Sequence, residues 1–384
     1  MSLAVELATA GATGWIAVHT AICGVAMARA LRPRPRPQPS TAANVLLVRP
    51  CTGDDPHLVA ALRSTGALET RGTLRIVFTV ESRSDAAWPI IEGVAEELRD
   101  AGADATATVT PTQAYNRKVG QLAAATNETD ADVVLCVDAD VDLSGFDLDA
   151  FIAPLSDASG LGAVWAPPVE VAAPQTWGDR ASAAVLGASL HAFTLLGELD
   201  EAGLVGKTFA LRTDALRSTG GFVQLTRHLG EDMELARRLR IHGWGSRMHR
   251  TPVRSIAAHR PLRGVLARYT RWLWVIRAQR PALLASYPLL LAATPLLLMV
   301  TAALSAFAPT WGLALAAVVL GTRIAVAFTA ARPRGRRLQA VTLDWALSDA
   351  VLLLAFIRAL GKPEVSWRSK TLRIDRDGRL TATP

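Results

Sequence analysis

Residues 133–142 read VVLCVDADVD, and this stretch decides how the rest of the chain is interpreted. Its apolar part, residues 133–137, runs directly into Asp138 and, one residue later, Asp140. A short continuous apolar run is typical of a strand buried on both faces of a parallel sheet. In open α/β sheets, ligands bind at the carboxyl ends of the strands. The stretch therefore predicts a central strand with an acidic ligand site at its end.

The two carboxylates have two interpretations. At positions i and i+2 after a strand, they suit a hard divalent cation, Mg²⁺ or Mn²⁺, that also holds substrate phosphates. Asp is equally common in turns, where its side chain bonds to the nearby backbone. The stretch alone leaves both open, and the rest of the chain favours the metal.

The composition indicates a membrane protein. Half of the 384 residues are hydrophobic, which is too apolar for an ordinary soluble protein. The formal net charge is +7, with basic residues clustered near apolar segments. Such clusters fit a lipid bilayer better than nucleic acid, so we expect no nucleic-acid partner. Cys23, Cys51 and Cys136 share no metal-ligand spacing, which indicates reduced packing residues.

The N-terminal segment reads as an anchor. Residues 7–28 carry no charge and are long enough to span a bilayer. Residues 26–28 resemble a signal-peptide cleavage site, but Glu6 and the lack of Lys or Arg before the apolar run are wrong for a signal peptide. An Arg-Pro run follows at 32–37. We expect an uncleaved anchor over 1–30, a stiff linker over 31–43, and a cytosolic domain thereafter.

Residues 44–260 alternate between predicted strands and helices, as is typical of a soluble α/β domain. Strands are expected over 44–48, 74–80, 105–109, 133–137, 162–166 and 206–212, and helices over 55–65, 87–100, 118–126, 181–196 and 233–242. This alternation predicts a doubly wound, mostly parallel sheet. No GxGxxG follows the first strand, so a dinucleotide site is not expected. Glu231 and Asp232 precede the last helix, where capping through the helix dipole is the simpler interpretation and catalysis the alternative.

The C-terminal part returns to the membrane. Residues 261–280 mix Arg with Tyr and Trp and predict an interfacial amphipathic helix. Residues 281–360 form the membrane segments: the uncharged 281–322 is long enough for two spans, and 339–360 is a third apolar segment. The basic run 332–337 should face the cytosol, and residues 361–384 form a polar tail. Asp344 and Asp349, inside the third segment, either line an acceptor entry or pair with Arg323 or Arg358.

Taken in order, these segments resemble the family 2 and family 21 glycosyltransferases, most closely the ceramide glucosyltransferase group, with a hopanoid-associated branch nearby. The resemblance covers residues 44–280 and the tail. It is carried by VRP at 48–50, GDDP at 53–56, NRKV at 116–119, residues 132–140, GKT at 206–208, GGF at 220–222, ED at 231–232, HGW at 242–244, RYTRW at 268–272 and PEVSWR at 363–368.

The resemblance implies a GT-A fold with one N-terminal and two to three C-terminal membrane helices. It implies an inverting transfer of a hexose or N-acetylhexosamine from a UDP-sugar to a membrane lipid hydroxyl, first of all UDP-glucose to ceramide or a similar lipid. A hopanoid or diacylglycerol acceptor comes next. A processive polysaccharide synthase and, from a different class, a non-catalytic UDP-binding scaffold subunit are the alternatives. The Ala- and Arg-rich usage suggests the inner membrane of a bacterium.

The resemblance also implies residue roles. Asp85 corresponds to the acid near the nucleotide base, with Glu81 as the alternative. Asp138 and Asp140 would hold the ribose and the metal-diphosphate, and Asp232 would be the catalytic base beside Glu231. The diphosphate and acceptor residues would be Arg268, Arg271 and Trp272.

Some further residues have two possible roles or depart from the family pattern. Lys118 reaches a phosphate or is solvated. His228 or His259 completes the metal shell, or each is a solvated or capping residue. The chain departs from the group twice, because it keeps Asp140, which eukaryotic members of the ceramide group usually lack, and carries Lys207 where the group has a small or apolar residue.

Overall fold

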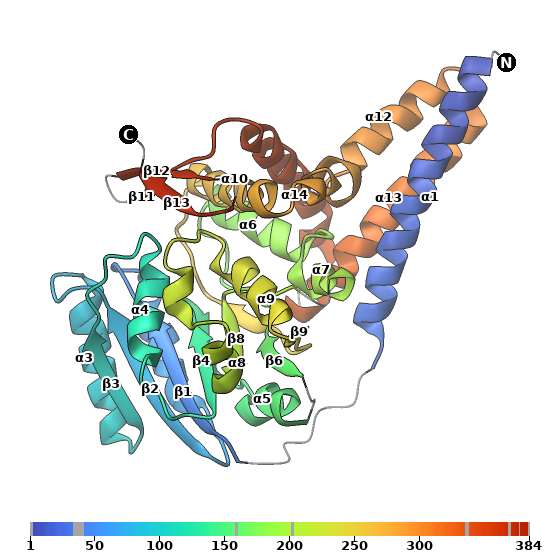
Figure 1. The fold of residues 1–384 in the computed structure, drawn as a ribbon. Coiled ribbons are helices and arrows are strands. Elements are labelled where there is room, and N and C mark those ends of the chain that lie inside the picture. Colours follow the sequence, from blue (N-terminus) through green and yellow to red (C-terminus); the bar gives the residue numbers. More distant parts are fainter. Residues whose placement is uncertain are drawn as a thin grey trace. The chain divides into compact units, whose positions relative to one another are not determined.

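The computed structural model describes residues 3–33, 42–157, 160–200, 203–334, 338–367, 370–375 and 377–382. The chain divides into two compact units, whose elements are labelled in Figure 1. The sheet unit comprises Arg34–Ala172, Asp200–Ala258 and Ser366–Pro384. The helical unit comprises Met1–Pro33, Ala173–Leu199 and His259–Val365. The expected α/β region is therefore interrupted, because Ala173–Leu199 groups with the helical unit.

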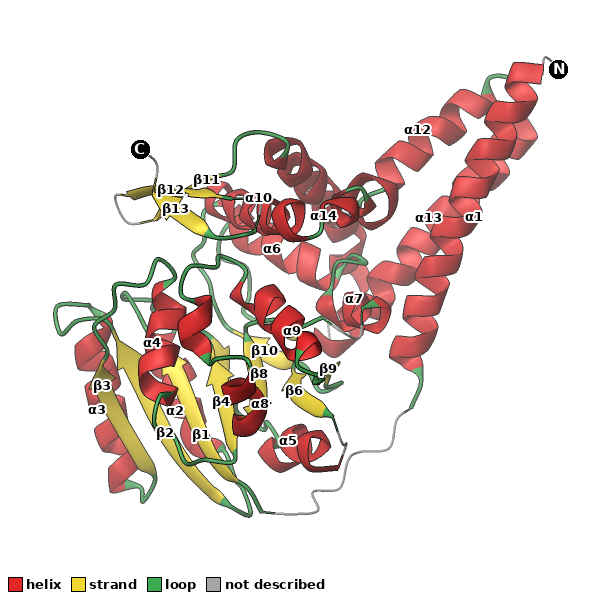
Figure 2. Ribbon diagram, viewed as in Figure 1, coloured by secondary structure: helices red, strands yellow, loops and turns green. Residues whose placement is uncertain are grey.

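A mostly parallel sheet is the framework of the sheet unit (Figure 2). Its strands are β1 (Asn44–Pro50), β2 (Thr73–Val80), β3 (Asp104–Val109), β4 (Val133–Val137), β6 (Leu161–Trp165), β8 (Thr208–Arg212) and β9 (Gly245–Met248). They are arranged in the order β3-β2-β1-β4-β8-β6-β9. Strand β8 alone runs antiparallel to its neighbours β4 and β6 within this sheet. All five residues of β4 are buried, as a central strand requires.

Helices cover both faces of this sheet. They are α2 (Leu58–Arg63), α3 (Ala87–Asp100), α4 (Arg117–Thr126), α5 (Leu148–Asp157), α8 (Thr213–Ser218) and α9 (Glu231–Ile241), with short 3₁₀ turns at Ser64–Ala67 and Phe222–Leu225. Buried residues of α2, α3 and α5 form one apolar cluster with Leu47, Phe78 and Leu135 of the strands. Helix α4 lies in front of the sheet in Figure 2 and contacts β1 and β2. The doubly wound arrangement predicted from the sequence is confirmed.

Shorter elements complete this unit. A second sheet has the order β5-β10-β7, from β5 (Val141–Asp142), β7 (Pro168–Glu170) and β10 (Val253–Ser255). The tail, expected only to be polar, forms strand β11 (Glu364–Trp367) and an antiparallel hairpin of β12 (Lys370–Ile374) and β13 (Leu380–Ala382). Three parts of the sequence analysis fall on residues outside the description: most of the Arg-Pro linker, the end of the basic run at 335–337, and the side chains of 365–368.

Two helices differ from the sequence expectation. The helix predicted over 55–65 begins at Leu58, because Asp55 instead forms a turn in which its carbonyl accepts the Leu58 N–H at 2.9 Å. The helix predicted over 181–196 is two helices, α6 (Trp177–Gly187) and α7 (Phe193–Leu199). Helix α6 begins earlier than predicted because Thr176 and Asp179 form a reciprocal capping box.

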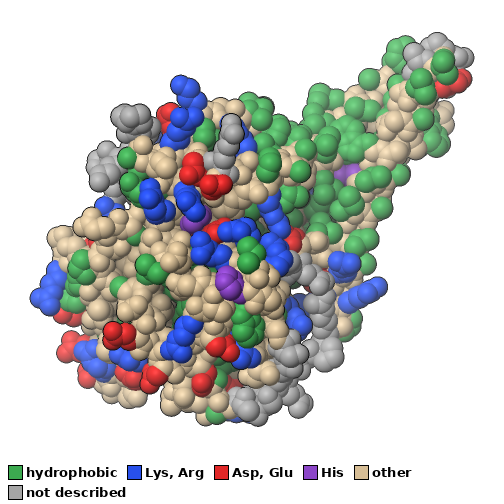
Figure 3. Space-filling model, viewed as in Figure 1, with side chains coloured by type: hydrophobic (Ala, Val, Ile, Leu, Met, Phe, Trp, Pro, Cys, Tyr) green, Lys and Arg blue, Asp and Glu red, His purple; other side chains and the backbone are tan. Residues whose placement is uncertain are grey.

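The helical unit is built from long apolar helices. Besides α6 and α7 it contains α1 (Leu3–Leu31), α10 (Leu262–Gln279), α11 (Pro281–Leu284), a π-helical turn (Tyr287–Leu291), α12 (Thr294–Ser305), α13 (Pro309–Ala331), a 3₁₀ turn (Arg332–Arg334) and α14 (Leu338–Ala359). Buried residues of α1, α6, α10, α13 and α14 share one apolar cluster. Figure 3 shows hydrophobic side chains gathered on the surface of α1, α12 and α13.

Two helices in the described residues are long and apolar enough to cross a membrane. They are Val5–Leu31 and Pro309–Ala331. A bent pair, Pro281–Leu291 and Thr294–Ser305, meets at 55° and makes a third candidate if it counts as one broken span. The predicted N-terminal and C-terminal membrane helices are therefore present as candidates. The region expected to hold two spans, 281–322, contains this bent pair followed by the continuous helix α13, which begins at Pro309.

The carboxylates of α14 have cationic partners. Asp349 lies 3.0 Å from the Arg323 guanidinium, which also donates to the Ala188 carbonyl at 2.6 Å and the Ser348 hydroxyl at 2.7 Å. Asp344 lies 3.3 Å from Arg180, a partner that the sequence did not indicate. Of the two interpretations left open, the structure favours pairing.

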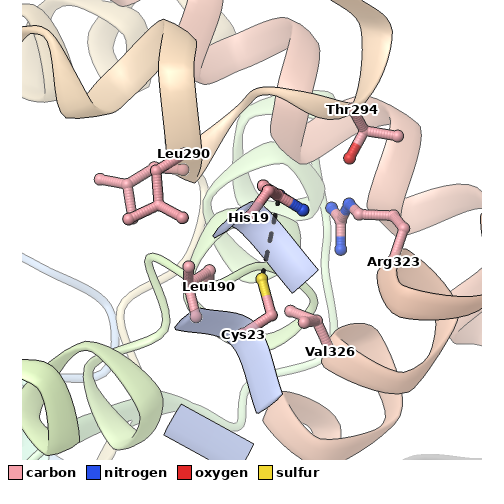
Figure 4. A pocket seen from close by; sticks show the side chains of 8 residues that line it. His19, Cys23, Leu190, Leu290, Thr294, Arg323 and Val326 are labelled. Carbon is pink, nitrogen blue, oxygen red and sulfur yellow. Dashed lines mark hydrogen bonds between the residues drawn. The ribbon is translucent and has the colours of Figure 1, made fainter. Parts of the chain in front are cut away.

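A pocket of the helical unit lies beside Arg323 (Figure 4). His19 and Cys23 of α1 face it, with their Nε2 and Sγ atoms 3.8 Å apart. Leu190, Leu290 and Val326 supply apolar walls. Because Arg323 is already bonded to Asp349, Ser348 and backbone carbonyls, we assign this pocket a structural role.

Candidate active site

The candidate site lies where several strands of the main sheet end. The parallel strands β1, β2 and β4 all end at one edge, and the antiparallel strand β8 begins there. The register pairs Val137 with Thr208, so the residues before β8 lie beside the residues after β4. The Asp138 N–H donates to the Lys207 carbonyl at 2.9 Å and fixes this arrangement.

Each acid of the Asp138–Asp140 pair has its own lysine. The Lys118 ammonium, near the start of α4, lies 2.6 Å from Asp138 Oδ1. The Lys207 ammonium lies 2.6 Å from Asp140 Oδ2, and the Ser255 hydroxyl is 3.3 Å from the same oxygen. The solvated alternative for Lys118 is therefore wrong, because its ammonium is also 3.4 Å from Glu231 and donates to the Gly206 carbonyl at 2.7 Å.

Glu231 and Asp232 belong to the same cluster. Asp232 Oδ2 accepts the Gly206 N–H at 3.0 Å, and Glu231 Oε2 accepts from the Asn116 side chain at 3.1 Å. Gly206 needs to lack a side chain, because a Cβ there would lie 3.3 Å from Asp232 Oδ2 and 3.4 Å from Glu231 Oε1. Asp232 Oδ1 does accept the Met233 N–H at 2.8 Å, but helix capping does not account for the other contacts.

The electrostatics suit a base and a cation. Burial and the neighbouring Glu231 charge raise the pKa of Asp232 to about 6, against the opposing effect of the Gly206 and Met233 N–H groups and Lys118. Burial alone would lower the pKa of Lys118, but Asp138, Glu231 and Asp232 outweigh it and raise that pKa. When ionised, these four carboxylates outnumber Lys118, Lys207 and the nearby Arg49 guanidinium by one, which leaves negative charge for a cation.

Arg49 is a site residue to which sequence reasoning gave no role. It is fully buried at the end of β1. Its guanidinium donates to the carbonyls of Val141 at 2.6 Å, Asp138 at 3.0 Å and Ala139 at 3.3 Å, and to that of Ala61 at 2.7 Å. Arg49 therefore holds the backbone that carries the acid pair. An arginine that ends an otherwise apolar strand was the available signal.

Asp85 lies at the same edge, before α3. Its carboxylate accepts the Gly53 N–H at 2.7 Å, the Thr52 hydroxyl at 2.8 Å and the Ala87 N–H at 3.0 Å. It therefore joins the loop after β1 to the start of α3. The alternative acid, Glu81, forms an ion pair with Arg117.

Arg268, Arg271 and Trp272 lie on α10, in the helical unit. The Arg268 guanidinium lies 5.5 Å from the Trp272 ring centroid and contacts the Ser182 hydroxyl. Trp272 also stacks on His191, with ring centroids 6.1 Å apart. The predicted base Asp232, the acid pair and Lys118 thus lie in the sheet unit, whereas Arg268, Arg271 and Trp272 lie in the helical unit.

The two histidines face other groups. His228 Nε2 lies 4.0 Å from Glu234 Oε1, and burial lowers the His228 pKa. His259 lies in the helical unit, where its backbone N–H donates to the Asp179 carboxylate at 2.9 Å. Among the described residues no group of three or more His, Cys, Asp or Glu could hold a metal. A cation here would have Asp138 or Asp140 as its protein ligands.

This sheet, with an acid pair after its central strand, defines a glycosyltransferase of the GT-A fold. The chain belongs to glycosyltransferase family 21, whose family model matches residues 12–380. No curated protein matches the chain.

Solved structures with a similar fold include the following two. A mannosyltransferase from Pyrobaculum calidifontis, in complex with GDP-Man and Mn²⁺, is 20% identical, with a TM-score of 0.50 over 92% of this chain and 99% of that chain. Glucosyl-3-phosphoglycerate synthase from Mycobacterium tuberculosis, in complex with Mn²⁺ and UDP-glucose, is 16% identical, with a TM-score of 0.40 over 64% and 83%. The first similarity supports the fold, and the second is too low to carry an argument.

Proposed function

We propose that this family 21 glycosyltransferase moves a hexose or N-acetylhexosamine from a UDP-sugar to a hydroxyl group of a membrane lipid. UDP-glucose and ceramide, or a similar lipid, are the first donor and acceptor to test. The observation that carries the proposal is the cluster in which Lys118 bonds both to Asp138 and to the Gly206 carbonyl, while the Gly206 N–H bonds to Asp232, whose pKa is raised. This cluster supports the proposal that the base and the diphosphate site are adjacent.

Donor binding is assigned to the edge of the sheet. Asp85 is placed near the nucleotide base, and Asp138 near the ribose. Lys118 adds a cation, already fixed beside Asp138, for the phosphates. The Lys118 ammonium is a compact point charge on a long side chain, which suits a contact with a phosphate group.

Asp140 is proposed to hold Mg²⁺ or Mn²⁺. The donor set fits, because Mg²⁺ is commonly bound by one or two carboxylates together with substrate phosphates and water. Structures with Mn²⁺ among the proteins of similar fold support this choice. When bound, the metal would neutralise charge on the leaving diphosphate.

Asp232 is proposed to be the general base, with Glu231 raising its pKa. The acceptor oxygen forms a bond to the anomeric carbon while the bond from that carbon to the diphosphate breaks, and the hydroxyl proton passes to Asp232. A single displacement inverts the anomeric centre, so an α-linked donor gives a β-linked product. General bases typically contribute ~10²–10⁴-fold to the rate.

The acceptor is proposed to reach the site from a bilayer. The candidate spans and the apolar surface of α1 and α13 support a membrane location. We place the catalytic unit in the cytosol, and assign Arg268, Arg271 and Trp272 to the diphosphate and the acceptor. Exclusion of bulk water by the membrane would limit hydrolysis of the donor.

A donor-release assay tests the proposal. Membranes that hold the protein receive UDP-glucose, UDP-galactose or UDP-N-acetylglucosamine, with Mg²⁺ or EDTA, and with or without ceramide or total lipid extract. We expect lipid-dependent UDP release from one donor that EDTA abolishes. Release that ignores lipid would favour a polysaccharide synthase, and UDP binding without release would favour a scaffold subunit.

A further inference from the structure

The residues just before β8 connect all four acids of the site. Gly206 donates its N–H to Asp232 and accepts Lys118 at its carbonyl, and Lys207 accepts the Asp138 N–H at its own carbonyl. The Lys207 ammonium then reaches Asp140 at 2.6 Å. The Lys207 ammonium therefore lies against Asp140, in the position where a bound cation is proposed.

The two lysines of the site are held differently. Lys118 is fixed by Asp138, Glu231 and the Gly206 carbonyl. Among the described residues, the Lys207 ammonium has one partner, the Asp140 carboxylate. This ammonium stands at the end of a flexible four-carbon stem, and the Lys207 side chain is 19% exposed. Lys118 is therefore a fixed part of the cluster, whereas Lys207 can leave Asp140 by breaking a single contact.

An ammonium and a divalent cation compete for the same carboxylate. Two cations within ~4 Å of each other repel, and the repulsion is stronger near a protein surface than in bulk water. A metal that takes Oδ2 of Asp140 displaces the Lys207 ammonium from the carboxylate oxygen to which it is bonded. A metal that arrives with a nucleoside diphosphate brings phosphate oxygens to which the displaced ammonium can move.

We propose that Lys207 couples metal binding to nucleotide binding. Without nucleotide, its ammonium occupies the cation position at Asp140 and weakens the binding of free metal. With nucleotide, it moves to the diphosphate, so metal and nucleotide enter together. This inference rests on the proposed function of Asp140 as the metal ligand. It also assigns a role to the lysine that departs from the small or apolar residue expected at this position.

Manganese binding, followed by electron paramagnetic resonance, tests the coupling without any turnover. The full chain in lipid nanodiscs is titrated with Mn²⁺ alone, with Mn²⁺ and UDP, and with Mn²⁺ and GDP. For wild type we expect UDP or GDP to raise the affinity for Mn²⁺ by ~5- to 150-fold, the usual range of coupling between sites. For Lys207→Met we expect tighter binding of Mn²⁺ alone and a smaller gain from nucleotide than in wild type, because the competing charge and its transfer are lost while the phosphate oxygens still contact the metal.

Three variants make the result specific. Lys207→Arg keeps the charge and should keep the nucleotide effect, and Lys362→Met, an exposed lysine of the helical unit, should match wild type. Asp140→Asn should weaken Mn²⁺ binding with nucleotide present. A melting curve for each variant confirms that it is folded.

The outcomes separate the two claims. If wild type binds Mn²⁺ only with nucleotide and Lys207→Met behaves identically, the role of Lys207 is wrong while the metal–nucleotide site stands. Equal affinity for Mn²⁺ with and without nucleotide in wild type also overturns the coupling. If no folded form binds Mn²⁺ under any condition, the proposed metal site itself fails and the inference with it.

Discussion

Asp232 is held in a partly exposed position, where its protonation state depends on Glu231. Because its pKa is raised to about 6, the basic form exists above that pH and is lost as the pH falls through it. We predict that kcat decreases below about pH 6. Glu231→Gln removes a charge that raises this pKa, so the decrease should move to lower pH. A pH–kcat profile that is the same in both proteins would contradict this coupling of the two acids.

Arg49 tests how the acid pair is positioned. Arg49→Met leaves several buried carbonyls without a donor, each costing ~1–3 kcal/mol. We predict that the free energy of unfolding of the sheet unit falls by about 3 kcal/mol or more. Thermal denaturation of the full chain, followed by a signal from the sheet unit, measures this change. The control Arg75→Met, at an exposed position of β2, should change it by no more than ~0.5 kcal/mol. Equal effects of the two variants would contradict the role of Arg49.

At the scale of elements, the C-terminal hairpin supports the segment before Glu231 and Asp232, the acids proposed for catalysis. The Leu380 N–H donates to the Arg227 carbonyl at 2.6 Å, and the Gly378 carbonyl accepts the Leu229 N–H at 3.4 Å. Leu380 is fully buried. The hairpin thus fixes residues 227–229, which lead through Gly230 into the acids at the start of α9.

We predict that a chain ending at residue 367, which lacks β12 and β13, still enters membranes but loses at least ~10-fold in kcat, the equivalent of ~1.4 kcal/mol of lost positioning. Leu380→Ala should act in the same direction, because burial of the leucine is lost. The neighbouring Thr381→Ala is the matched control. Full activity of the truncated chain, measured in the donor-release assay, would show that the hairpin does not position the acids.

Much of the element order could be predicted from the sequence because the strands and helices carry strong periodic patterns. The break between α6 and α7 could not, because Ser189 bonds to the backbone on both sides: its hydroxyl donates to the Val185 carbonyl at 2.7 Å and accepts the His191 N–H at 3.1 Å. Such bonds compete with the helical ladder. The short strands of the second sheet, two and three residues long, are too brief for any pattern.

The candidate site could also be predicted only in part from the sequence. The acid pair and Glu231 with Asp232 could be singled out in the sequence by their places after a strand and at the start of a helix, but turn formation and helix capping explain the same pattern, and only the family resemblance favoured a site. Their ion pairs with Lys118 and Lys207 could not be predicted, because these depend on the antiparallel entry of β8 beside β4. The buried position of Arg49 likewise appears only when β1 and the turn after β4 are brought together.

At the scale of the whole molecule, an ion pair between two long helices carries stability. Arg323 of α13 and Asp349 of α14 are both buried. Removing one partner leaves an uncompensated charge, which typically costs ~3–5 kcal/mol. We predict that Asp349→Leu lowers the melting temperature strongly, whereas Arg323→Met with Asp349→Leu restores much of the loss. Asp100→Leu, at an exposed position, is the control, and an additive double variant would contradict the pairing.

The central claim is that this family 21 enzyme transfers a sugar to a membrane lipid with Asp232 as the base. Its most direct test is the transfer of radiolabelled sugar from the donor into chloroform-soluble product, by membranes holding wild type or Asp232→Asn. We predict labelled lipid with wild type and at least ~100-fold lower turnover with the variant, at unchanged UDP affinity and melting temperature. Near-wild-type turnover by Asp232→Asn, or label found only in water-soluble product, would contradict the account.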